Sequence, residues 1–168
     1  RTTDDSVYEG DETATISISG VSGGSATESG TQEVSITISE NESAPTVTLT
    51  TSATSIDENS GSVLTLTATL SNATTADVTV SIATSGTATE GTDYTDGSGN
   101  IDDIVISAGN TTETISFKPT DDSVYEDDET ATISISGVSG GSATESGTQA
   151  VSITISENES TPTVTLAV

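Results

Sequence analysis

The residues of this chain that could do chemistry are carboxylates, and they are densest in TDDSVYEDDET, residues 120–130. Six of the nine positions from Asp121 to Glu129 are Asp or Glu, and the nearest basic residue is Lys118. Two like charges about 4 Å apart repel by roughly 1–4 kcal/mol, depending on the local dielectric constant. A Ca²⁺ ion takes about six to eight oxygen ligands and would reverse that repulsion. The cluster therefore predicts a Ca²⁺ site, with a solvated acidic loop as the alternative.

The overall composition narrows the choice of partners. The chain has 27 Asp and Glu residues against 2 Lys and Arg residues, which gives a formal net charge of -25. We therefore expect no binding to nucleic acid or anionic membrane, because both require basic surface. No apolar run of about 18 residues is present, so we expect no membrane insertion. His and Cys are both absent, which favours Ca²⁺ over zinc as the bound metal.

The elements that must position these carboxylates are indicated by strict alternation of apolar residues with Thr and Ser. Period two is typical of half-buried strands, and no segment carries a helical period. The β-branched residues that fill these segments also favour strands. We therefore expect an all-β fold with antiparallel strands. The alternating segments are residues 61–70, 77–84, 112–119, 129–137 and 149–157.

The chain is internally repetitive. Residues 3–49 recur almost unchanged as residues 120–166, which lie 117 positions later. Near-identity at a fixed spacing indicates a tandem array, and this spacing suits one β-sandwich of about 100 residues. Gly10 stands at the position of Asp127, whereas the five other carboxylates of the cluster are the same in both copies. A role that both copies share is therefore not expected to depend on Asp127.

The boundaries of the repeat are suggested by SENESTPTV, in which polar residues and Pro162 precede a new apolar strand, and by its twin around Pro45. Strands that belong to a preceding repeat would lack their own partners. We expect them to pair with a neighbouring repeat or with another chain. The expected division is residues 1–43 as the last strands of a preceding repeat, residues 44–160 as one complete repeat, and residues 161–168 as the first strand of the next.

The central part of the chain resembles a Calx-beta domain. Residues 86–136, GTATEGTDYTDGSGNIDDIVISAGNTTETISFKPTDDSVYEDDETATISIS, contain the Gly-Thr-Ala turn, the Asp-Tyr pair and the Asp-Asp-x-x-Tyr-Glu-x-x-Glu motif of that family. IDENSGSVLTLT upstream and VSITISENE downstream match its opening and closing segments. The resemblance implies a two-sheet antiparallel β-sandwich of immunoglobulin-like shape, with Ca²⁺ bound in loops at one end.

The resemblance also implies a set of Ca²⁺ ligands at that end. They are Glu58, Asp93, Asp121, Asp122, Glu126 and Glu129, the Val124 carbonyl, and the closing acidic residues Glu157 and Glu159. Asn158 lies between the last two, where the family usually has consecutive Asp residues. In the earlier copy, the matching candidates are Asp4, Asp5, Glu9 and Glu12.

An enzymatic role is not expected. GVSGG at residues 137–141 fits the pattern Gly-x-Ser-x-Gly around Ser139, but a nucleophilic serine needs a base and the chain has no His. Paired carboxylates could in principle hydrolyse glycosides, but the three Tyr, one Phe and no Trp offer few aromatic platforms for sugar.

Two functions agree with this sequence. The first is a structural repeat of a large bacterial-type adhesin or extracellular filament, in which each module is a spacer stiffened by Ca²⁺. Such a protein is secreted or on the cell surface and contributes to cell adhesion or biofilm. Its partners would be neighbouring repeats of the same chain and other copies in a filament. The alternative is a calcium-sensing regulatory domain, as in sodium–calcium exchangers, and the near-identity of the copies favours the first.

Overall fold

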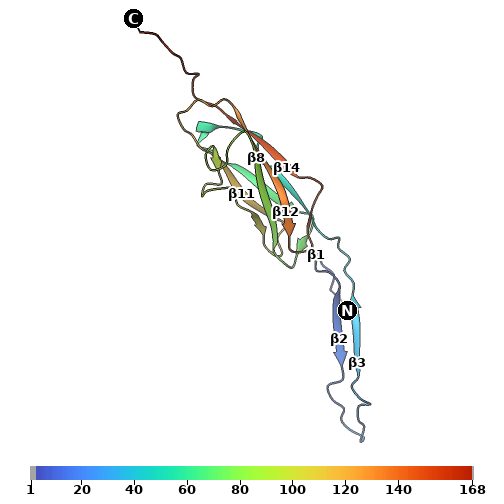
Figure 1. Ribbon diagram of the computed structural model, residues 1–168. Helices are drawn as coiled ribbons and strands as arrows, with labels where there is room; N and C mark the ends of the chain where they lie inside the picture. The colour runs from blue at the N-terminus through green and yellow to red at the C-terminus, as the bar shows by residue number, and fades with distance from the viewer. Residues whose placement is uncertain (1–2, 168) are drawn as a thin grey trace.

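Two five-stranded sheets pack face to face in the computed structural model, which describes residues 3–167 (Figure 1). This arrangement confirms the predicted all-β sandwich. One sheet has the order β13-β4-β6-β11-β9, with β4 (Thr46–Thr51), β6 (Leu64–Leu70), β9 (Tyr94–Thr95), β11 (Thr112–Pro119) and β13 (Thr144–Glu145). The other has the order β10-β8-β12-β14-β5, with β5 (Ser55–Asp57), β8 (Val78–Gly86), β10 (Ile104–Ile106), β12 (Glu129–Ser139) and β14 (Ala150–Ser156).

The long strands pair antiparallel, as predicted, but the edges add short parallel pairs that the sequence did not indicate. β13 runs parallel to β4, and β5 runs parallel to β14. Along the chain, β5 follows β4 and β13 follows β12, and in each case the chain changes from one sheet to the other. Each crossing covers an edge that would otherwise expose unpaired backbone groups.

The core lies between the sheets and follows the alternation of the sequence. In β6, the side chains of Leu64, Leu66, Ala68 and Leu70 are buried, whereas the Thr residues between them are exposed or half-buried. Phe117 belongs to the same buried cluster as Ile133 and Ile153. Its ring stacks on that of Tyr94 with centroids 4.8 Å apart. This aromatic pair fixes β9 against β11 at one end of the sandwich.

The segments outside the sandwich leave from its opposite ends (Figure 1). At the N-terminal side, β2 (Glu12–Ser17) and β3 (Glu33–Ile38) form an isolated antiparallel hairpin. β1 (Val7–Tyr8) pairs in parallel with β7 (Ala73–Thr74) of the sandwich. At the other side, residues 157–167 form no strand. Within residues 3–167, no helix has the length and apolar character needed to cross a bilayer.

Burial differs sharply between the two copies of the repeated sequence. Ile133 in β12 is 0% exposed, and its counterpart Ile16 in the hairpin is 61% exposed. Val164 and Leu166 are 99% and 94% exposed, whereas their counterparts Val47 and Leu49 are buried in β4. Identical local patterns therefore become core or surface according to whether an opposing sheet covers them.

Candidate metal centre

Three interlocking groups of carboxylates gather at the end of the sandwich from which residues 157–167 depart. In each group, the candidate ligand oxygens all lie within 4.8 Å of one another. Glu58 and Glu126 each belong to two of the groups, so the three form one connected cluster. The groups are Glu58 with Asp122 and Glu126, Glu58 with Glu157 and Glu159, and Asp93 with Glu126 and Glu129.

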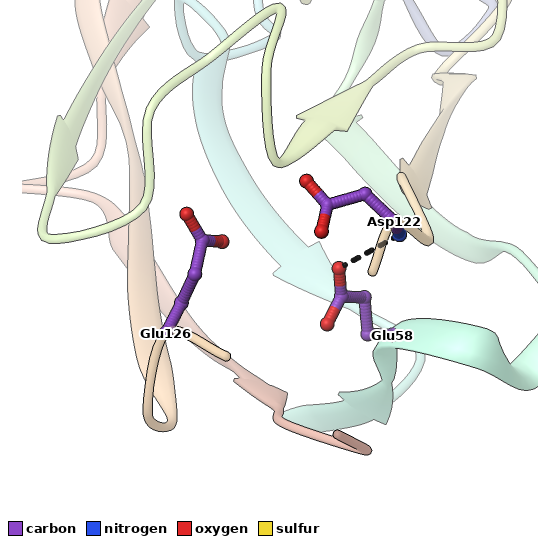
Figure 2. A group of neighbouring side chains, drawn as sticks. All are labelled: Glu58, Asp122 and Glu126. Atoms are coloured by element: carbon purple, nitrogen blue, oxygen red, sulfur yellow. Dashed lines mark hydrogen bonds between the residues drawn. The ribbon is translucent and has the colours of Figure 1, made fainter. Parts of the chain in front are cut away.

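Glu58 is placed by the crossing of the chain between the sheets. It begins the short 3-10 turn η1 (Glu58–Ser60), directly after β5. Because Asp57 pairs with Ser156 at the end of β14, Glu58 lies beside the point where the chain leaves that strand. Its side chain is only 8% exposed and accepts a 3.3 Å hydrogen bond from the Asp122 amide, so the carboxylates face a shared space (Figure 2). Loss of hydration raises the pKa of Glu58.

Asp93 is held in the loop between β8 and β9. The loop leaves β8 through Gly86, whose φ of +123° and whose approach to the Thr130 carbonyl leave no room for a Cβ atom. The Asp93 carboxylate accepts a 2.6 Å hydrogen bond from the Thr89 amide. The Asp93 carbonyl accepts a hydrogen bond of 2.9 Å from the Thr120 amide, just after β11. The Asp93 loop is thereby tied to the segment that carries the other carboxylates.

Asp122 and Glu126 come from the loop between β11 and β12, and Glu129 comes from the start of β12. Asp122 accepts a 2.6 Å hydrogen bond from the Val124 amide, which shapes the turn. Glu129 is the first residue of β12 and pairs with Ile155. Loss of hydration, followed by a hydrogen bond with Asp93, raises the pKa of Glu129 from 4.5 to about 7. The negative charges of Asp93, Glu126 and Glu58 add to this rise in the pKa of Glu129.

Glu157 and Glu159 complete the cluster just beyond β14. The Glu157 carboxylate accepts hydrogen bonds from the amides of Glu159, Asn158 and Glu126, and these lower its pKa to about 2. The Oε2 atom of Glu159 is buried and has no hydrogen-bond partner among the described residues. A buried acceptor without a donor is uncommon in folded proteins, and a bound cation would supply the missing partner.

The residues present fit a small cation of the calcium type. Every candidate ligand is an oxygen, which is the donor that Ca²⁺ prefers. The hollow that Glu58, Asp93, Glu126, Glu129 and Glu157 line has a volume of about 10 Å³. That is room for about one water-sized sphere, and far below the roughly 300 Å³ of a site for an organic ligand.

Some residues that the sequence indicated lie outside the three groups. Asp121 lies next to them and contributes negative charge that raises the pKa of Glu58, but it is in no group. Val124 is 57% exposed, and its amide, not its carbonyl, takes part in the hydrogen bonding. Asp127, which is Gly10 in the other copy, lines the hollow but also belongs to none of the groups.

Within residues 3–167, the carboxylates of the earlier copy form no such group. Its four predicted ligands Asp4, Asp5, Glu9 and Glu12 line one hollow together with Glu40 and Glu42, but no three carboxylates there meet as in the complete cluster. Sequence reasoning missed Glu40 and Glu42, although the repeat spacing of 117 residues relates them to Glu157 and Glu159 and could have identified them.

The raised pKa of Glu129 predicts how the cation-free protein responds to pH. Between pH 7 and its ordinary pKa of 4.5, the folded protein binds a proton at Glu129 that the unfolded chain does not bind. Stability in chelator should therefore increase as the pH falls from 8 to 5.5, and it should be lost again as the pH rises through 7. The measurement is the thermal midpoint in chelator at both pH values.

A matched pair of variants tests the assignment to this residue. Glu129→Gln should remove most of the increase in thermal midpoint that acidification from pH 8 to 5.5 produces in chelator. At pH 8, the variant should unfold at a higher temperature than the parent protein. Glu113→Gln, on the exposed edge of β11 and outside the three groups, should leave the rise unchanged. A midpoint that stays constant or falls on acidification to pH 5.5 would contradict the prediction.

The fold and the site together define a class: a β-sandwich domain whose acidic loops converge at one end. The chain belongs to the Calx-beta domain family, whose model matches residues 40–161. A solved structure described as the apo form of the Calx CBD1 domain is similar, with a TM-score of 0.53 and 20% sequence identity over 67% of this chain and 98% of that chain. A structure of CBD12 from CALX1.2 has a TM-score of 0.50 and 21% identity, over 61% of this chain and 40% of that one. No curated protein matches the chain by sequence.

Proposed function

We propose that this chain is a calcium-binding structural repeat of a long secreted or cell-surface protein, an adhesin or an extracellular filament, with residues 44–160 as the complete module. The observation that carries the proposal is the convergence of the carboxylates of Glu58, Asp93, Glu126 and Glu157 from four separate segments within one small hollow. The near-identical copies 117 residues apart support a role as a repeated spacer.

Cation binding at this cluster would stiffen the end of the module. Glu58, Glu126, Glu129, Glu157 and Glu159 are the residues that would hold the ion together with Asp93 and Asp122. The bound ion would supply positive charge that offsets the repulsion among them and would supply a partner for the unpaired oxygen of Glu159. Since Glu157 and Glu159 directly precede the junction with residues 161–167, the ion would also restrain the direction in which the chain leaves the sandwich.

The second candidate is a calcium-sensing regulatory domain. Its support is the similarity to the solved Calx domains, which shows a shared fold. The two candidates differ in what calcium does. A spacer gains stability without a change in sheet packing, whereas a sensor changes the shape that it presents to a partner domain. Amide hydrogen exchange separates them, because a spacer gains protection only around the cluster and a sensor also changes at a distant surface.

The primary test is thermal unfolding of the full chain with millimolar Ca²⁺ and with chelator. A ligand that binds only the folded state at 100 times its dissociation constant adds about 2.7 kcal/mol. For a chain of this size, that corresponds to a rise of about 5–10 °C in the midpoint. Mg²⁺ at the same concentration should give a smaller rise, because it demands a tighter octahedral set of ligands. Equal midpoints in Ca²⁺ and chelator would refute cation binding.

A further inference from the structure

One contact between the N-terminal segment and the sandwich is a short strand addition. Val7 pairs with Ala73, and Tyr8 pairs with Thr74, in parallel register. The pair lies at the end of the sandwich from which the hairpin departs (Figure 1). A second contact reinforces it, because the Asn72 side-chain amide donates a 2.8 Å hydrogen bond to the Ser43 carbonyl. Both contacts join a segment of the first copy to the edge of the module that follows it.

The same segment occurs again at the opposite end of the module. Val124 and Tyr125 repeat Val7 and Tyr8, 117 residues later, in the loop between Asp122 and Glu126. They form no strand pair with any described residue, and Val124 is 57% exposed. One end of the complete repeat therefore carries Val124–Tyr125, the counterpart of the paired strand β1. The other end carries the Ala73–Thr74 edge to which β1 binds.

The receiving edge suits an acidic strand. Residues 70–76, which include Ala73 and Thr74, contain no charged side chain. The docking loop, by contrast, is crowded with carboxylates, and like charges placed opposite each other would oppose association. Backbone hydrogen bonds of an added strand need no particular side chain, so the pairing depends on register and on the lack of repulsion.

From this we infer that Val124–Tyr125 is the docking strand of the repeat, and that it adds in parallel to the Ala73–Thr74 edge of a second copy that follows along the chain. The inference rests on the proposed tandem arrangement. It places the docking strand between Asp122 and Glu126, two of the carboxylates of the candidate cation cluster. The loop that would bind the ion is thus also the loop that holds the next module.

Disulfide trapping tests this pairing, since the chain contains no native Cys. The first protein is the full chain with Val7→Cys and Ala73→Cys. The second is the full chain extended after Val168 by a further copy of residues 52–168, which continues the repeat in phase. It carries Val124→Cys in the first module and Ala73→Cys in the second. Both should form an intramolecular cross-link under mild oxidation, because paired strands hold the two Cβ atoms within disulfide reach.

The control keeps Val124→Cys but moves the second Cys to Asn59 of the following module, at its far end. We expect about tenfold less cross-link there, since only the tether then brings the two sulfurs together. The docking inference is overturned if the cross-link to Ala73 is no more abundant than the control, both in Ca²⁺ and in chelator. It is supported if the cross-link to Ala73 exceeds the control in either condition. The proposed cation binding is judged separately, by the thermal midpoint.

Discussion

Alanine in place of Ile133 is expected to lower the free energy of unfolding by about 2–5 kcal/mol. The side chain of Ile133 is 0% exposed and belongs to the buried cluster that holds Phe117 and Ile153. Its removal would leave a cavity that the neighbouring strands of the sandwich cannot fill, because β12 is paired on both sides. Denaturant titration of the full chain measures the change.

The chain contains a natural control for this substitution. Ile16 lies in the same octapeptide, ETATISIS, but its side chain is 61% exposed on the isolated hairpin. Ile16→Ala is expected to change the free energy of unfolding of the sandwich by less than about 0.5 kcal/mol. Because the local sequence is identical, effects on the unfolded chain are matched, and the difference between the variants reports tertiary burial alone. Equal losses in the two variants would contradict this assignment of core and surface.

Glutamine in place of Glu58 is expected to remove most of the stabilisation by Ca²⁺. Glu58 belongs to two of the three carboxylate groups and is the buried member of both. If the variant binds Ca²⁺ 100-fold more weakly, a gain of about 2.7 kcal/mol falls to about 0.4 kcal/mol at the same Ca²⁺ concentration. The substitution keeps an oxygen that can accept the hydrogen bond from the Asp122 amide, so the fold in chelator should be retained. Thermal midpoints with Ca²⁺ and with chelator measure both effects.

The matched control for this loss is Asp127→Gly. Asp127 adopts a left-handed backbone with φ of 73°, and Gly10 adopts a φ of 76° at the equivalent position. Glycine accepts this conformation without strain, and the Asp127 carboxylate belongs to none of the three groups. The Asp127→Gly protein should therefore keep its Ca²⁺-dependent shift. If both variants lost the shift to the same degree, the cluster would act as diffuse negative charge and not as a defined site.

Much of the fold could be predicted because strand formation depends on a local pattern. Alternation in residues 61–70 and 129–137 identified β6 and β12, since period two places every second side chain on one face. The parallel edge pairs of β5 and β13 could not be predicted in this way. They depend on where a short strand crosses to the other sheet, and the sequences of two or three residues carry no period.

The candidate site likewise has a part that depends on local sequence and a part that depends on the tertiary structure. Hydrogen bonds around Glu40 repeat those around Glu157: the Glu40 amide donates to Asp11 at 2.9 Å, and the Glu157 amide donates to Asp128 at 3.0 Å. These networks form in both copies, whether or not a sandwich surrounds them. Each joins only the two ends of one hairpin.

The sequence by itself therefore determined the long strands, the hairpins and the hydrogen-bonded acidic turns of both copies, since these depend on residues that are neighbours within one supersecondary unit. The tertiary structure decided which residues of each copy become core: Ile133 is buried and Ile16 is exposed, whereas Val47 is buried and Val164 is exposed, because burial requires an opposing sheet. It also decided where the carboxylates meet. Glu58 and Asp93 reach the cluster only when β5 crosses to β14 and Tyr94 stacks on Phe117, and no local pattern encodes those contacts.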